Sequence, residues 1–256
     1  MGMRGALFAA TVAVVVAGAV ACDASSYLPA GHPEVECVSV PSCAGGGSTS
    51  ISIGFYSNGT AAPDNSHVSL CADKEALHLH YTADDDMFLK NTYVGCNTDM
   101  YNQEVVEAFV SPSAVDTPFY HECEISPTNQ LYIAHVHNPY LNGSDLGHTM
   151  IDCQASGIIH NVTTDSTAHS WTASLKMPWS LLADNAPPLA DDEPRTASGL
   201  PQVWRTNFFR VIMAKNVDMC ADDGSCLFRA WSSPNTQPAA FHKPRRFGVM
   251  VLPADL

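Results

Sequence analysis

A period-two alternation of apolar and polar residues is the feature that most constrains this fold. In "WTASLKM" (171–177), Trp171, Ala173, Leu175 and Met177 fall on one face of an extended strand, because successive side chains point to opposite faces. Other segments that alternate, or that are rich in aromatic and β-branched residues, are 50–56, 77–81, 104–110, 131–137, 204–213 and 247–252. Helical periodicity is scarce; "PWSLLAD" (178–184) suits one helical turn. We therefore predict an all-β protein, an antiparallel β-sandwich of jelly-roll type.

The N-terminus has the pattern of a secretory signal peptide. Arg4 precedes the apolar run 6–20, and Ala19 and Ala21 are small residues before the expected cleavage point. The run is too short and too rich in alanine for a membrane anchor, so we expect no membrane insertion. Residues 1–21 are predicted to be the signal peptide. Residues 22–256 are predicted to form a single, secreted extracellular domain with a disulfide-rich N-terminal extension.

The cysteines indicate an oxidising compartment. Nine are present. If Cys22 is set aside at the cleavage site, an even number remains, which is typical of a disulfide framework. The disulfide candidates are Cys37, Cys43, Cys71, Cys96, Cys123, Cys153, Cys220 and Cys226. Pairing neighbours in sequence would join 37–43, 71–96, 123–153 and 220–226, but the sequence alone does not choose among connectivities.

Three sequons predict N-glycosylation on surface loops of a eukaryotic secreted protein. They begin at Asn58, Asn142 and Asn161. The chain is also acidic, with a formal net charge of -14. That charge argues against nucleic acid and anionic membrane surfaces as partners. It is compatible with neutral sugars.

One pair of carboxylates suggests chemistry, with a simpler interpretation beside it. Glu122 and Glu124 in "HECEI" share a strand face about 6–7 Å apart, which suits the acid/base pair of a sugar hydrolase. Solvated carboxylates, or carboxylates paired with arginine, are the simpler interpretation, and no G-x-S-x-G, HExxH or P-loop motif supports an enzyme.

Histidine pairs and an acidic turn raise the question of metal binding. His78/His80 and His135/His137 each place two side chains on one strand face, as metal ligands require. Half-exposed polar residues are the favoured interpretation, because no third ligand is evident. The run 84–86 in "TADDDMF" offers carboxylates for a structural calcium ion, although an acidic turn would look the same. No cofactor is required by the sequence.

The order of several motifs carries a family resemblance. They are "HLHYTADDD" (78–86), "YNQEVVEAF" (101–109), "WTASLKMPW" (171–179), "WRTNFFRV" (204–211) and "WSSPNTQPAAFHKPRRFG" (231–248). Together they resemble the family 9 carbohydrate-binding modules (CBM9-like domains) of the DOMON-like superfamily, from about Leu77 to the C-terminus. The resemblance implies a non-catalytic β-sandwich that holds a sugar between two aromatic side chains, with a glutamate bonding the sugar hydroxyls.

Five residues form the predicted carbohydrate-binding set. Tyr101 and Phe241 match the aromatic positions of the family, where tryptophan is usual, and Glu107 matches the glutamate. Asn207 and Arg210 add amide and guanidinium groups for the hydroxyls. The basic segment "FHKPRR" (241–246) is expected to lie at the rim and offset the charge of Glu107. The arginine that follows the family's next strand has no counterpart, since "YHECEISP" (120–127) occupies that region.

The sequence thus predicts a secreted carbohydrate-binding protein whose partner is an extracellular or cell-wall glycan. Three alternatives stay open. One is a haem-binding cytochrome domain of the DOMON type, for which Met87 would be a candidate ligand. The second is the secreted glycoside hydrolase, and the third is a structural protein that has lost sugar binding.

Overall fold

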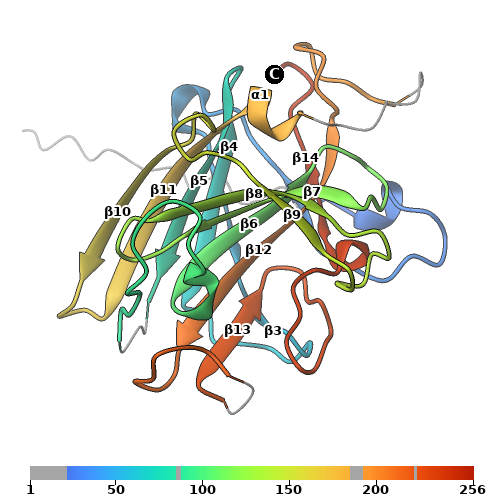
Figure 1. Cartoon of the computed structure of the whole chain (residues 1–256). Helices are drawn as coiled ribbons and strands as arrows, with labels where there is room; N and C mark the ends of the chain where they lie inside the picture. The colour runs from blue at the N-terminus through green and yellow to red at the C-terminus, as the bar shows by residue number, and fades with distance from the viewer. Residues whose placement is uncertain (1–21, 85–87, 185–192, 222–223) are drawn as a thin grey trace, which may run out of the picture.

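Two β-sheets pack face to face in the computed structural model, which describes residues 22–84, 88–184, 193–221 and 224–256. Figure 1 shows the strands of one sheet running across those of the other. The nine-stranded sheet contains β1 (Cys37–Ser39), β14 (Gly248–Val251), β12 (Val203–Met213), β6 (Val105–Ser111), β7 (Phe119–Ile125), β8 (Leu131–His137), β9 (Gly147–Met150), β13 (Cys226–Ala230) and β3 (Phe55–Tyr56). The five-stranded sheet contains β10 (Ile159–Asp165), β11 (Ser170–Pro178), β5 (Ala76–Ala83), β4 (Ser66–Ala72) and β2 (Thr49–Ser52). The predicted all-β sandwich is confirmed.

Helices are short, as the sequence predicts. The predicted turn is α1 (Trp179–Leu182). The 3₁₀ helices are η1 (Ala24–Ser26), η2 (Ala44–Gly46), η3 (Met100–Asn102) and η4 (Pro244–Arg246). Within the described residues, no helix has the length and apolar character needed to cross a membrane. The predicted signal peptide, 1–21, lies outside the described residues.

Two details of the strands differ from the prediction. The pairing of β1 with β14 is parallel, so the larger sheet is mixed rather than purely antiparallel. The segment 50–56 does not form one strand: β2 pairs in the five-stranded sheet and β3 in the other. Gly54 lies between them, and a glycine inside a strand pattern commonly marks such a bend.

The inner faces of the sheets form the main core. Trp171, Ala173, Leu175 and Met177 of β11 are all buried there, as their alternation predicts. The centre of the nine-stranded sheet is covered on both faces, because every residue of β6 and β12 is buried. On β6, Val106 and Ala108 enter the core between the sheets, whereas alternate residues join a second cluster on the outer face. Polar residues on that outer face are therefore buried rather than solvated.

Loops build this second cluster over the outer face. Met100, Phe241 and Phe247 come from segments outside the strands and pack with Phe109 of β6 and Phe209 of β12. Two ring contacts show the packing: Phe109 lies edge to face with Phe247 at 5.9 Å and with Phe209 at 5.0 Å. The loops thus cover part of the outer face of the sheet, and a pocket lies between them and the strands.

The disulfides correct the cysteine prediction. The bonds are Cys22–Cys37, Cys43–Cys71, Cys96–Cys153 and Cys220–Cys226. Of the sequence-local pairs, 220–226 is confirmed. Cys22 takes part in a bond, and Cys123 is a buried free thiol. The strand alternation of β7 turns Cys123 into the core between the sheets, and Cys153 is bonded to Cys96 instead.

Candidate functional site

A cavity of about 450 Å³ opens over the outer face of β6 and β7. Tyr101, Glu107 and Phe241, predicted from separate motifs, all line it. Glu107 is on β6, Tyr101 on η3, and Phe241 on the loop before η4. The tertiary structure therefore brings together three of the five residues in the predicted carbohydrate-binding set.

Tyr101 presents an accessible ring. It is 41% exposed, and its ring meets that of Tyr132 edge to face at 6.0 Å. Its hydroxyl donates a hydrogen bond to Asp99 Oδ1 at 3.1 Å. Partial burial, followed by this hydrogen bond, raises the pKa of Tyr101 to about 12, so the phenol is neutral at physiological pH.

Phe241 is held more firmly. It is 9% exposed, and its ring stacks on Phe209 with centroids 4.1 Å apart and planes at 14°. Phe228 meets the same ring edge to face at 5.9 Å. This packing sets the orientation of the ring, and leaves a small part of it for contact with a ligand.

Three carboxylates converge beside these rings. Glu107 pairs directly opposite Glu124 across β6 and β7, and Glu122 lies on the same face of β7. Each offers an oxygen within 4.8 Å of the others. Burial, reinforced by the neighbouring carboxylates, raises the pKa of Glu107 and of Glu124 well above the usual range.

Two histidines face Glu122. His148 Nε2, from β9, is 3.2 Å from Glu122 Oε2, and His242 Nε2 is 3.8 Å from Glu122 Oε1. Contact with Glu122 raises the pKa of His148, whereas burial lowers the pKa of His242. The segments "HECEI" and "FHKPRR" stand out in the sequence, but nothing in it predicts that they meet. No motif in "GHTM" marks His148 as a site residue.

Asn207 and Arg210 do not line this pocket. Arg210 pairs with Val106, a core residue, so its side chain points between the sheets. There it donates to Glu104 Oε1 at 3.2 Å and to Ser66 Oγ at 2.8 Å. Asn207 lies on the outer face but donates to the backbone oxygen of Ser232 at 2.7 Å, and is fully buried.

The basic residues of 241–246 also turn away from Glu107. Lys243 donates to the backbone oxygen of Asn142, and Arg245 lies 3.4 Å from Asp116. His242 is the member of this segment that reaches the carboxylates. The expectation that lysine and arginine offset Glu107 is therefore wrong, since these side chains find partners on other loops.

The histidine pairs on other strands serve separate contacts. His78 lies 2.6 Å from Asp73, and His80 lies 2.8 Å from Ser174 Oγ. His135 stands near His121, with ring centroids 4.3 Å apart, and His137 stacks on Phe119 at 4.7 Å. These are the polar-face roles that the sequence allowed.

The structure describes only some of the other predicted sites. Positions 85–87, which include Met87 and most of the predicted calcium ligands, lie outside the described residues. The sequon residues Asn58, Asn142 and Asn161 are all exposed. Asn161 lies on strand β10 rather than on a loop, and glycosylation at the three residues stays a prediction.

No protein-family model matches the chain. An extracellular protein of Arthroderma benhamiae is 31% identical over 189 residues, which span 72% of this chain and 77% of that protein. A Bacteroides uniformis structure, provisionally assigned as a carbohydrate-binding protein, matches with a TM-score of 0.62 and 14% identity over 86% of this chain and 100% of its own. This likeness shows a shared fold.

A weaker match is a family 9 carbohydrate-binding module of Caldicellulosiruptor kristjanssonii in complex with cellotriose. Its TM-score is 0.48 at 13% identity, over 86% of this chain and 94% of the module.

Proposed function

We propose that the chain, which belongs to the same family as the extracellular protein of Arthroderma benhamiae, is secreted and binds carbohydrate without catalysis. The sugar occupies the pocket of about 450 Å³, and the protein's partner is an extracellular or cell-wall glycan. One observation carries the proposal: residues chosen for an aromatic-and-glutamate sugar site lie on three separate segments yet line one cavity.

The chemistry of the lining suits a sugar. A pyranose has an apolar CH-rich face that packs on an aromatic ring, and Tyr101 offers the more accessible one. Glu107, Glu122 and His148 line the same cavity and can exchange hydrogen bonds with hydroxyls. The shared fold with the Bacteroides uniformis protein adds support, as do the four disulfides, which are typical of secreted chains.

Burial argues against a hydrolase that uses Glu122 and Glu124 together. Glu124 is 0% exposed and does not line the cavity. A carboxyl acting as nucleophile or general acid has to reach the glycosidic bond. The pair is better placed to shape the charge of the pocket than to attack a substrate.

The test is binding of the secreted protein to a glycan array, followed by titration of the strongest glycan. Tyr101→Ala should weaken binding of the titrated glycan by about 1–2 kcal/mol, or about 5- to 30-fold in Kd, because the stacking ring is lost. Tyr27→Ala is the matched control, since Tyr27 is 38% exposed and lies outside the pocket. If both variants bound the glycan with the affinity of the native protein, the site assignment would be refuted. Binding of no glycan at all would favour the structural alternative.

A further inference from the structure

Three side chains in the pocket are arranged like metal ligands. Glu122 comes from β7, His148 from β9, and His242 from the loop before η4. The two histidine Nε2 atoms approach different oxygens of Glu122, at 3.2 and 3.8 Å, and one ligand atom from each residue lies within 4.8 Å of the others. The imidazole rings stand nearly perpendicular, at 82°, with centroids 5.6 Å apart.

These separations match a small coordination sphere. Zn²⁺ binds imidazole nitrogen and carboxylate oxygen at about 2.0–2.2 Å in tetrahedral geometry, so neighbouring ligand atoms lie about 3.3–3.6 Å apart. The two Glu122 contacts lie just below and just above that range, but they use different carboxylate oxygens. One ligand atom from each residue already lies within 4.8 Å of the others, so small side-chain adjustments would bring a single carboxylate oxygen and the two nitrogens to these separations.

The supporting contacts also fit a metal centre. His242 Nδ1 lies 2.7 Å from the Tyr120 hydroxyl, which orients the ring so that Nε2 faces Glu122. Asn138 holds the same loop by donating to the backbone oxygen of His242 at 3.1 Å. Ligating histidines typically use their second ring nitrogen in this way.

The local charge suits a cation. Glu107, Glu122 and Glu124 are all buried and close together, and no described residue donates a hydrogen bond to either carboxyl oxygen of Glu124. None of the described residues lining the pocket is a lysine or an arginine. Buried carboxylates in such a group require protons or a positive ion to compensate their charge.

We propose that Glu122, His148 and His242 bind a divalent transition-metal ion, of which Zn²⁺ is the first candidate. Two imidazoles and a carboxylate favour zinc and its neighbours over calcium and magnesium, which take all-oxygen sites. Three protein ligands leave a fourth position for water or a ligand in the cavity. This site does not depend on the proposed sugar binding.

The test is a calorimetric titration of ZnCl₂ into the full secreted protein, purified without a polyhistidine tag and dialysed against EDTA and then metal-free buffer. We expect one equivalent to bind, and CaCl₂ to give no binding at this site. His148→Ala should weaken zinc binding by more than about tenfold, since even loss of a supporting residue costs about 10–100-fold. Co²⁺ in place of zinc should give the visible absorption of a four-coordinate ion.

Two further variants keep the result decisive. Glu122→Gln preserves the shape of the side chain and removes its charge, so it should also lose zinc affinity while thermal unfolding reports that it folds. His80→Ala is the matched control, because His80 lies on the five-stranded sheet and contacts Ser174. The proposal is overturned if the native protein binds no zinc, or if His148→Ala and Glu122→Gln bind it as tightly as His80→Ala. No sugar is present, so failure of the carbohydrate proposal leaves this outcome unchanged.

Discussion

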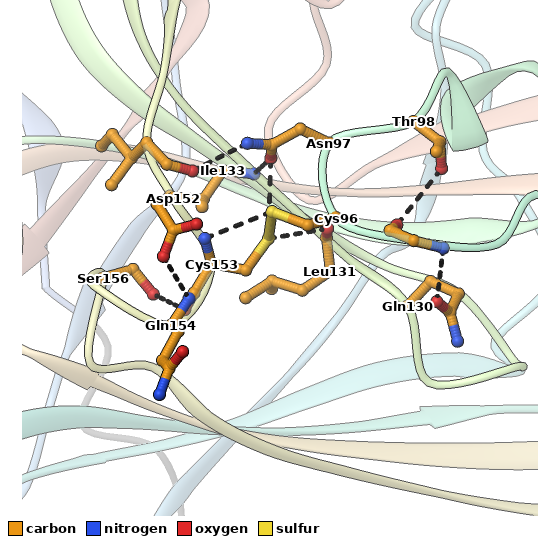
Figure 2. The surroundings of a disulfide bond; sticks show 12 residues. Cys96, Asn97, Thr98, Gln130, Leu131, Ile133, Asp152, Cys153, Gln154 and Ser156 are labelled. Carbon is orange, nitrogen blue, oxygen red and sulfur yellow. Dashed lines mark hydrogen bonds between the residues drawn. A yellow bond between two sulfur atoms is a disulfide. The ribbon is translucent and has the colours of Figure 1, made fainter.

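The Cys96–Cys153 disulfide joins the two segments that carry Tyr101 and His148 into the pocket. Cys96 precedes η3, and Cys153 follows β9. Figure 2 shows the bond beside Asn97, whose side chain donates to the backbone oxygen of Ile151 at 2.7 Å and accepts from the Ile133 backbone at 2.8 Å. These backbone contacts do not require the sulfur atoms, so the native arrangement should survive without the bond.

The cost of losing the bond should therefore come mainly from the unfolded chain. Its cysteines are 57 residues apart. In the chain-entropy model, opening a loop of that length lowers the free energy of unfolding by about 4 kcal/mol. The Cys220–Cys226 bond closes only 6 residues, for which the same model gives about 2 kcal/mol. The comparison tests the mechanism, because the two bonds share the same chemistry.

The assay is equilibrium urea denaturation of two double variants, Cys96→Ser with Cys153→Ser and Cys220→Ser with Cys226→Ser. The free energy of unfolding should fall about 2 kcal/mol further in the first than in the second, and a near-ultraviolet dichroism spectrum checks that both are folded. Equal losses, or a larger loss for the short loop, would refute the loop-entropy reasoning. They would show instead that local contacts around the sulfur atoms dominate.

Two other predictions concern buried groups. Cys123 is 1% exposed, and burial raises its thiol pKa. Ellman's reagent should therefore find no reactive thiol in the native protein and one per chain in denaturant without reductant. Two or more thiols per chain in denaturant would contradict the four disulfides. Glu104 is 0% exposed and accepts from Arg210 Nε and from the Met213 backbone, so Glu104→Ala should cost about 3–5 kcal/mol in urea denaturation. The exposed Glu75→Ala is its control, and similar losses in the two would count against a buried ion pair.

Local patterns predicted the strands well because they depend on near neighbours. Alternation in 171–177 correctly placed four residues in the core, since a one-residue shift would turn the whole set to solvent. The break in 50–56 was missed. A bend at Gly54 that moves the chain from one sheet to the other depends on partners distant in sequence.

The same distinction applies to the pocket. Motif order identified Tyr101, Glu107 and Phe241, which share the cavity. The prediction that Arg210 belongs to the site is not supported by the strand register. The residue opposite Glu107 is Phe209, and Arg210, at the next position, faces the other side of the sheet. Register between β6 and β12 decides this, and a single strand's sequence does not state its register.

The sequence by itself determined the all-β class and the core faces of the strands, and it predicted the aromatic and carboxylate positions of a candidate sugar site. Only the tertiary structure decided which cysteines pair, which way Arg210 points, and that His148 and His242 meet Glu122. The physical reason is range. Side-chain alternation follows from backbone geometry over a few residues, whereas these contacts join separate strands and loops whose approach depends on the packing of both sheets.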